Sequence, residues 1–266
     1  MNDQDFLFGN TDVVADDIAR SQLRMLAWNM ASPSLERARR QVDWLYETGR
    51  NVIVMSEVKI GEGSRHITKE LESSGFIVTK ARTGAEDRYM TVVATKGYAV
   101  RPLQLSFNTS RVVAARLTTH FGELDVVGLY SLTNGMSVES SRNRKKFQEQ
   151  LVQALRDRLT TEPDVPMLLT GDYNVLEPGH RPASTLFEEH DYDFYRALIA
   201  LGLVDGYRHI QPEGRDLTWY GPQGGQLLDY ALMSPGAAER LTECGFDHHA
   251  RSSGLSDHSA LLLTAG

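Results

Sequence analysis

The sequence of 266 residues contains a single cysteine, Cys244, and no long apolar run. One cysteine excludes an intrachain disulfide and a metal cage built from several thiolates. No stretch approaches the about 18 consecutive apolar residues that suggest a membrane-spanning helix, so we expect no membrane partner. The first residues, MNDQDFLFGNTDVVADD, are acidic and lack the basic start of a secretory signal peptide. These absences favour a reducing, cytoplasmic location.

An excess of positive charge is also missing. The chain has 28 Lys and Arg against 35 Asp and Glu, a net charge of −7. Proteins that coat nucleic acids are usually basic, so the overall charge argues against a non-specific DNA-binding protein. It still allows a local basic groove, or an acidic site whose charge a divalent cation neutralises.

Short apolar runs alternate along the chain with amphipathic patterns. Runs typical of strands cover residues 23–28, 51–57, 76–82, 89–96, 112–120, 123–131, 165–174, 217–221, 226–234 and 258–264. Helical periodicity covers residues 36–49, 65–75, 137–159 and 193–205. We expect residues 1–20 to form an acidic arm and residues 21–266 a single domain. Mixed strands with flanking helices predict an α/β fold, a four-layer sandwich of two mixed β-sheets packed face to face with helices on both outer sides.

Polar residues follow several of these strands, where functional side chains are often placed. In LLTGDYN, Asp172 and Asn174 are two positions apart, so an extended chain directs both side chains to one face. The carboxylate can orient or deprotonate water, and the amide can donate and accept hydrogen bonds. Glu57 ends a strand of Val, Ile and Met, and hard divalent cations take such carboxylates. A Gly-Asp turn and an exposed strand end are the structural alternatives.

The segment GLSDHSALLL places Asp257 and His258 immediately before an apolar strand. Asp229 opens another strand, so it could orient the imidazole, which could then stabilise or protonate a phosphoryl oxygen. No GxSxG, Walker or GxGxxG motif stands beside these residues, so acyl transfer and dinucleotide chemistry lack support. Together with the polar residues above, they predict a metal-assisted phosphoryl-transfer site.

The segments LAWNM, VMSEVK, GLYSLTNG, RKKF, LLTGDYN, GLVDGYRH, LTWYGP, LLDYALMS and GLSDHSALLL follow one another across nearly the whole chain. In this order they resemble the endonuclease/exonuclease/phosphatase superfamily, and within it the exonuclease III-type AP endonucleases. The resemblance implies a four-layer α/β sandwich and a Mg²⁺-dependent phosphodiesterase or phosphomonoesterase, with Mn²⁺ as an alternative ion.

The resemblance also implies roles for individual residues. Glu57 corresponds to the principal metal ligand, Asn29 helps to order that ligand shell, and Asp257 corresponds to a second-metal or outer-shell carboxylate. For the catalytic positions, Asp172 in LLTGDYN corresponds to the residue that activates the attacking water, and Asn174 to the neighbour that orients the phosphate. His258 in GLSDH corresponds to the phosphate-binding histidine, which Asp229 in LLDYALMS holds in place.

Tyr130, a further catalytic candidate, resembles a phosphate-contacting tyrosine at the start of an element that includes Asn134, a candidate for substrate binding. Trp219 matches an aromatic residue that, in DNA-repair members, lies near the pocket for an extruded sugar; a plain core position is the alternative. Leu227 stands where the nuclease branch usually has Arg, and the Tyr130–Asn134 element is one residue longer than usual and lacks its Pro. These departures leave the substrate open.

Further candidates for substrate binding are basic. Arg142 and Lys146 are four residues apart on the long predicted helix and share one face. They could contact a nucleic-acid backbone, although a solvated helix face is the alternative. His180 and Arg181 follow the LLTGDYN segment and are better placed for substrate.

We therefore expect a phosphodiesterase that acts on DNA, with nucleic acid as the partner. A superfamily hydrolase for a small-molecule or lipid phosphate ester is the alternative, and an inactive binding protein on the same fold is a third interpretation. The intact set of predicted catalytic residues is evidence against the third. The sequence leaves the oligomeric state open.

Overall fold

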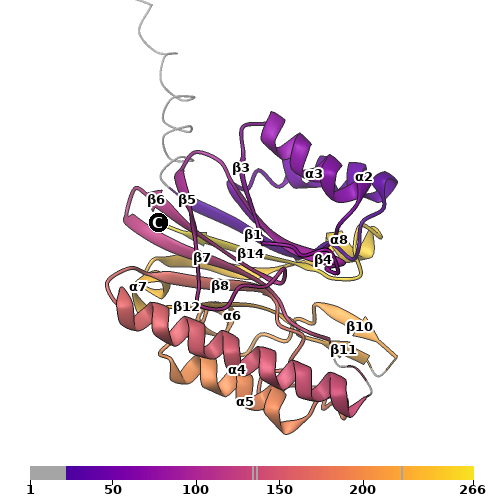
Figure 1. Cartoon of the computed structure of the whole chain (residues 1–266), viewed down its shortest axis with the longest axis vertical. Coiled ribbons are helices and arrows are strands. Elements are labelled where there is room, and N and C mark those ends of the chain that lie inside the picture. The colour runs from indigo at the N-terminus through magenta and orange to yellow at the C-terminus, as the bar shows by residue number, and fades with distance from the viewer. Residues whose placement is uncertain (1–21, 134, 136, 223) are drawn as a thin grey trace, which may run out of the picture.

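The computed structural model describes residues 22–133, 135, 137–222 and 224–266. The predicted acidic arm, residues 1–20, and the predicted substrate-binding residue Asn134 lie outside the described residues. Two six-stranded sheets pack face to face, and Figure 1 shows helices on the outer side of each. The predicted four-layer α/β sandwich is confirmed.

The first sheet is mixed, because β1 and β2 run parallel while its other neighbouring strands are antiparallel. Across the sheet the order is β13 (Leu241–Asp247), β14 (Ala260–Ala265), β1 (Leu23–Asn29), β2 (Val52–Lys59), β4 (Tyr89–Thr95) and β3 (Ile77–Lys80). Helices α2 (Leu35–Glu47) and α3 (Glu62–Ser73) cover its outer face (Figure 1). Trp28, Ile53 and Met55 are fully buried in this layer.

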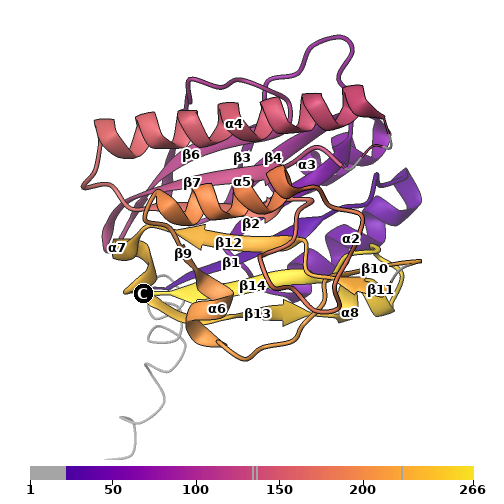
Figure 2. The same ribbon diagram turned by 90° about the horizontal axis from the view of Figure 1, so that it is seen from below.

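The second sheet has one parallel pair, β7 and β8. Its order is β5 (Ala99–Leu103), β6 (Val112–Thr119), β7 (Gly122–Tyr130), β8 (Met167–Asp172), β12 (Asp229–Met233) and β9 (Val204–Asp205). Helices α4 (Val138–Thr161) and α5 (Glu189–Ala200) lie side by side on its outer face, as both Figure 1 and Figure 2 show. The smaller elements are a hairpin of β10 (Trp219–Gly221) and β11 (Gly224–Gln226) and the helices α6 (Gly206–Ile210), α7 (Pro235–Ala238) and α8 (His249–Ser252).

The strands at the centre of the sandwich are buried on both faces, which is why they read as continuous apolar runs rather than as alternating patterns. The two sheets are in close contact beside Gly128 in β7. A Cβ atom there would lie 2.9 Å from Val54 Cγ1 of β2 and 3.0 Å from Thr91 Cγ2 of β4. Only a glycine fits at this position without displacing the opposite sheet.

Helix boundaries follow local capping. The Ser34 hydroxyl accepts a hydrogen bond from the Arg37 amide at the start of α2, and Gly49, at φ 58°, lies just after its end. The helix predicted at 193–205 is displaced, because a capping box of Glu188 and Asp191 starts α5 at Glu189. Within the described ranges, no helix is long and apolar enough to cross a membrane.

Candidate active site

The register of the strands brings four chain segments to one edge of the sandwich. Asn29 ends β1, Tyr130 ends β7 and Asp172 ends β8. The parallel pairing of β7 with β8 puts Tyr130 opposite Asp172, and the antiparallel pairing of β12 with β8 puts Asp229 opposite the same residue. Asp172 is therefore the centre of the cluster, with neighbours supplied from both sides of its own sheet.

Asp172 is buried and surrounded by N–H donors. Its carboxylate accepts hydrogen bonds from Asn29 Nδ2 at 2.8 Å, from the Asn174 amide at 2.9 Å and from Asn174 Nδ2 at 3.1 Å. Burial, with the nearby charge of Asp229 adding to it, raises the pKa of Asp172 to about 7, although His258 and the hydrogen bonds oppose the rise. A carboxylate with a pKa near neutrality is suited to accept a proton from water.

The backbone turns sharply around Asp172. Gly171, at φ 136°, precedes it, and a Cβ atom at this glycine would overlap the Leu129 carbonyl oxygen. Asn174 follows at φ 50°, so the segment is not extended there and the expected geometry is wrong. The two side chains nevertheless meet, because asparagine tolerates the left-handed conformation. Asn174 Nδ2 also donates to the Ser131 carbonyl at 3.2 Å.

Glu57 lies in a β-bulge and does not end its strand. The register of β2 against β4 shifts between Met55 and Val58, and Glu57 itself has φ 49°. A bulge bends the strand and re-aims a side chain, and a left-handed non-glycine residue is a strained conformation that clusters at functional sites. The half-buried carboxylate accepts hydrogen bonds from Ser32 Oγ at 2.7 Å and Asn29 Nδ2 at 3.2 Å.

His258 is buried beside the two aspartates. Its Nδ1 donates to Asp229 Oδ2 at 2.8 Å, and its main chain is held by the Trp28 indole and the Ser256 hydroxyl. Burial opposes the charge of the ring, but the Asp229 carboxylate, aided by Asp172, outweighs burial and raises the pKa of His258 to about 9. The imidazole is therefore a cation at neutral pH, and its Nε2–H is a donor suited to an anionic oxygen.

Tyr130 completes the cluster from β7. Burial, together with the charges of Glu57 and Asp172, raises the pKa of the Tyr130 phenol, so the group remains a hydrogen-bond donor. The guanidinium of Arg111 lies over the Tyr130 ring, 4.5 Å from its centroid. Sequence reasoning did not single out Arg111 or Ser32, because no motif marks either of them.

Glu57, Asp172, Asn174 and His258 border a cleft of about 780 Å³. Its described lining residues are Glu57, Thr133, Gly135, Ser137, Val138, Ser141, Asp172, Asn174, Thr185, Leu186, Phe187, Glu188, Trp219, Gln226, Leu228, Asp257 and His258. Asp257 is exposed at the rim, where its Oδ2 accepts a hydrogen bond from Trp219 Nε1 at 3.1 Å. The lining therefore combines polar and anionic side chains with apolar and aromatic ones.

The structure places the four basic candidates outside the lining of this cleft. Arg142 and Lys146 are exposed on α4, and Arg181 is exposed in its loop. The expectation that His180 faces substrate needs correction. This ring is buried, with Nδ1 donating to the Pro182 carbonyl at 2.9 Å and Nε2 accepting from the Leu227 amide at 3.1 Å. Both ring nitrogens are thus used to hold the loop.

Leu227 has a structural role that explains the absence of a cation. Its side chain is 0% exposed within the main core. Its carbonyl accepts a hydrogen bond from the Tyr230 hydroxyl at 2.7 Å, and its amide binds His180. An arginine side chain at this position would be buried rather than directed into the cleft.

The oxygen ligands at the site suit a magnesium ion. Among the described residues, no three His, Cys, Asp or Glu side chains form a group that could hold a metal ion by themselves. Mg²⁺ does not require such a group, because it is usually bound through one or two carboxylates and keeps several waters. Glu57 and Asp257 present carboxylate oxygens, the hard ligands that this ion prefers. Asn29 directs its Nδ2 at Glu57 and Asp172, and its Oδ1 accepts a hydrogen bond from the Ala31 amide, so it orders the carboxylates.

Comparison with known proteins agrees with this geometry. Residues 26–258 match the model of the Endonuclease/Exonuclease/phosphatase family. The chain belongs to this family. The match includes all the strand ends described above, and it confirms the resemblance inferred from the motifs.

Solved structures related to this family member share its fold. The 3′ phosphatase NExo from Neisseria, bound to a product DNA hairpin, has a TM-score of 0.75 at 19% identity and covers 92% of this chain and 99% of its own. An AP endonuclease from Archaeoglobus fulgidus has a TM-score of 0.73 at 22% identity, with 91% and 98% covered. The AP endonuclease LMAP from Leishmania major has a TM-score of 0.76 at 17% identity, with 98% and 92% covered.

A curated relative is similar in sequence. Recombination repair protein 1 of Drosophila melanogaster is 27% identical over 167 residues, which cover 57% of this chain. The matched region is 24% of that protein, so the chain spans about a quarter of the length of this relative.

Proposed function

We propose that the protein is a Mg²⁺-dependent phosphodiesterase that hydrolyses phosphate esters of nucleic acids, as a DNA endonuclease or exonuclease of the AP-endonuclease type. The observation that carries this proposal is the pair formed by Asp172 and His258. One is a buried carboxylate that can accept a proton, and the other is a buried cation that can bind an anionic oxygen. Both line the same wide cleft.

The first catalytic role belongs to Asp172. Its carboxylate takes a proton from the water that attacks phosphorus, as a general base within hydrogen-bonding reach would. The water oxygen forms the new bond to phosphorus, the bond from phosphorus to the leaving oxygen breaks, and that oxygen takes a proton from solvent. Asn29 and Asn174 hold Asp172 in position through their amides.

The second role is stabilisation of the phosphoryl oxygens. His258 donates from Nε2, while Asp229 fixes the ring through Nδ1. The Tyr130 phenol is a further donor beside the base. Donors that are already oriented before the reaction stabilise developing negative charge without reorganisation, and each is worth about 10²–10³ in rate in comparable sites.

Metal binding is assigned to the carboxylate of Glu57, which Asn29 links to Asp172 through hydrogen bonds. Glu57 would hold Mg²⁺, with Asn29 and Asp257 completing or ordering the ligands, and Ser32 fixes the Glu57 carboxylate through its hydroxyl. When bound, the ion supplies Lewis-acid polarisation of a phosphoryl oxygen.

The cleft supports a nucleic-acid substrate in two ways. It is several times larger than a phosphate group, and its lining includes Phe187 and Trp219, whose rings suit a base or sugar. The relatives described as AP endonucleases, and the 3′ phosphatase described as bound to a DNA hairpin, support the same substrate class. A small-molecule or lipid phosphate ester is the alternative, because the apolar lining residues of the cleft could equally contact the apolar part of such an ester.

One assay decides between these substrates. Purified protein with Mg²⁺ is incubated with abasic duplex, intact duplex, single-stranded DNA, and a panel of phospholipids and sugar phosphates. Asp172→Asn is the inactive control for contaminating nucleases. We expect cleavage of DNA to exceed that of the small esters. Hydrolysis of a small ester with every DNA left intact would establish the alternative.

A further inference from the structure

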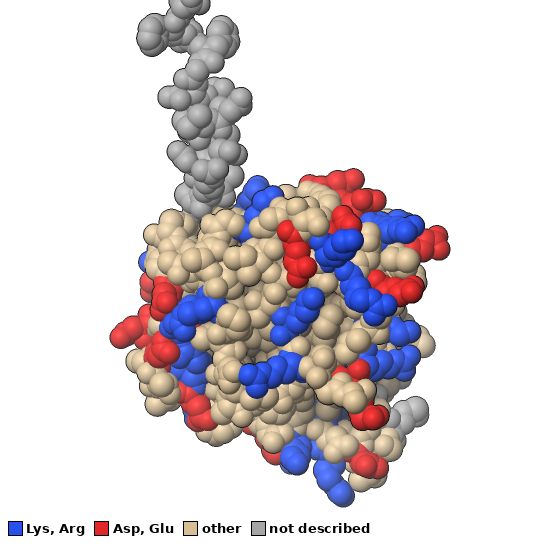
Figure 3. Space-filling model, turned by 45° about the horizontal axis from the view of Figure 1, so that its top comes forward, with Lys and Arg blue, Asp and Glu red and all other residues tan. Residues whose placement is uncertain are grey.

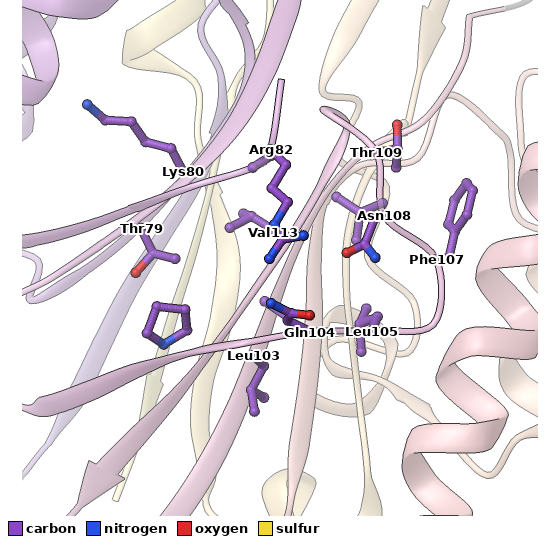
Figure 4. Close-up of a pocket in the computed structure, with 14 residues that line it drawn as sticks. Thr79, Lys80, Arg82, Leu103, Gln104, Leu105, Phe107, Asn108, Thr109 and Val113 are labelled. Carbon is purple, nitrogen blue, oxygen red and sulfur yellow. The ribbon is translucent and has the colours of Figure 1, made fainter. Parts of the chain in front are cut away.

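A second cavity opens where the two sheets part, at the edge formed by β3 and β5. It has a volume of about 110 Å³ and is lined by β3, β5, β6 and the loop between β5 and β6 (Figure 4). The cavity shares no described lining residue with the active-site cleft. Its volume is several times the space that one water needs, so it can take a group of phosphate size.

The lining of this edge cavity is suited to an anion. Its 14 described residues are Thr79, Lys80, Ala81, Arg82, Pro102, Leu103, Gln104, Leu105, Phe107, Asn108, Thr109, Val112, Val113 and Ala114. None of them is acidic, although the chain has a net charge of −7. On the face of the molecule drawn in Figure 3, by contrast, Lys and Arg alternate with Asp and Glu. A cavity with cations and no carboxylate concentrates anions locally.

Arg82 is the cation that faces into the cavity. Figure 4 shows its guanidinium group directed toward the side chains of Gln104 and Asn108. Lys80 also lines the cavity, but its ammonium group donates to Thr68 Oγ1 of α3 at 3.3 Å and so lies on the helix side. The planar fork of a guanidinium group matches two oxygens of a phosphate, and the neighbouring amides add further donors.

The edge cavity is close to the active site along the chain. Thr109 and Val112 line it, and Arg111 lies between them. The Arg111 carbonyl accepts the Tyr130 amide at 2.8 Å, and its guanidinium covers the Tyr130 ring. The two residues from Thr109 to Arg111 span at most about 7 Å, and the phosphates of one strand follow every 3.4 Å or so along a duplex axis. A strand held at Tyr130 therefore has another phosphate within reach of the cavity.

We propose that the edge cavity is a second phosphate-binding subsite, in which Arg82 binds a phosphate of the nucleic-acid strand a few nucleotides from the scissile bond. The subsite rests on the proposed function, since only a polymer reaches both sites at once. It favours long substrates over small esters, because a small ester fills the active-site cleft alone.

The test compares a long oligonucleotide with bis(p-nitrophenyl) phosphate for the wild-type protein, Arg82→Ala and Arg101→Ala. Arg101 is the matched control, because it removes the same charge from the neighbouring strand β5, where it pairs with Glu123 outside the cavity. For Arg82→Ala we expect the KM for the oligonucleotide to rise about eightfold at 0.1 M salt with kcat unchanged. The reason is the loss of one phosphate contact, which also lowers the log–log salt slope by about 0.9 on duplex DNA.

Three results would overturn the subsite while leaving the proposed function intact: an unchanged KM for Arg82→Ala, an equal rise for Arg101→Ala, or an equal loss on the small diester. Arg82→Lys should recover part of the affinity, since it keeps the charge but loses the fork. A wild-type protein that cleaves the diester and leaves all DNA intact would overturn both proposals. This result would be seen with the wild-type protein alone, so failure of the proposed function is distinguished from failure of the subsite.

Discussion

Asp172 and Glu57 are both carboxylates of one candidate site, but their surroundings suit them to different roles. Asp172 is buried and accepts hydrogen bonds from amide groups. Glu57 is half-buried, accepts hydrogen bonds from a hydroxyl and an amide, and lines the open cleft. The buried carboxylate is placed to take a proton. The more exposed one is placed to meet a hydrated cation, which keeps part of its water.

This difference predicts opposite responses to metal concentration. Glu57→Gln should raise the Mg²⁺ requirement and recover part of its activity at high Mg²⁺ or with Mn²⁺, because excess ion restores occupancy by mass action. Asp172→Asn should lose about 10²–10⁴-fold in kcat, the range of general-base catalysis, and should stay inactive at every metal concentration. The measurement is a metal titration of initial rates for both variants.

Circular dichroism is the control in that experiment, since both substitutions keep the volume of the side chain. Rescue of Asp172→Asn by metal, with no rescue of Glu57→Gln, would reverse the two assignments.

At the residue scale the sequence indicated which residues would lie together, but not the backbone geometry that holds them. The types and order of Glu57, Asp172, Asp229 and His258 along the chain indicated one cluster. The register of β12 against β8 brings Asp229 beside Asp172, and a hydrogen bond joins Asp229 to His258. The left-handed backbone conformation of Glu57 could not be predicted from the sequence, because no glycine marks the position and the bulge depends on pairing with β4. Ser32, also left-handed at φ 55°, was missed because no motif marks it.

At the scale of elements, strands with apolar runs were predicted and strands without them were not. The strand β5 is largely exposed, lies at a sheet edge and contains Pro102, which is tolerated only in such a place. The strand β13 is also at an edge, and its burial does not alternate along Leu241–Asp247. An edge strand is defined by its neighbour rather than by its own pattern, so the sequence carries little signal for it.

The turn at the end of β8 depends on a glycine that no other residue replaces. Gly171→Ala should destabilise the protein by more than Gly122→Ala, although both alanines would adopt a positive φ, at 136° and 111°. That backbone strain costs about 1–3 kcal/mol in each variant. A Cβ atom at Gly171 also overlaps the Leu129 carbonyl, whereas at Gly122 it meets no atom within 4 Å. Urea denaturation measures both; equal losses would show that the overlap is relieved without cost.

Helices α4 and α5 are joined by a buried ion pair near the cleft. Arg144 Nη2 lies 2.6 Å from Asp191 Oδ2, and both side chains are 0% exposed. Arg144→Met should cost about 3–5 kcal/mol of stability, because it leaves a buried carboxylate unpaired. The double variant Arg144→Met with Asp191→Leu should recover part of the loss, since it removes both charges, although it also removes the capping box of α5. Thermal and urea unfolding of the two proteins measure this, and a double variant no more stable than the single one would contradict it.

At the scale of the whole molecule, the two sheets form one core that reaches from α4 and α5 to the edge strand β13. Cys244 of β13 belongs to this core and is 3% exposed. Burial raises the pKa of its thiol, so little thiolate is present in the folded protein. The sequence predicted one domain from chain length and uninterrupted patterning, but not that an edge strand would share the central core.

This arrangement predicts that the thiol of Cys244 is protected until the sandwich opens. Thiol-reagent labelling of the native protein should be slow, and in increasing urea its rate should report the same free energy of unfolding as far-UV circular dichroism. The chain has no other cysteine, so the labelling signal needs no assignment. Labelling in full denaturant gives the reference rate for the exposed thiol. A labelling free energy well below the global value would instead mean that β13 detaches from β14 by itself, because local opening exposes a group at less than the full cost of unfolding.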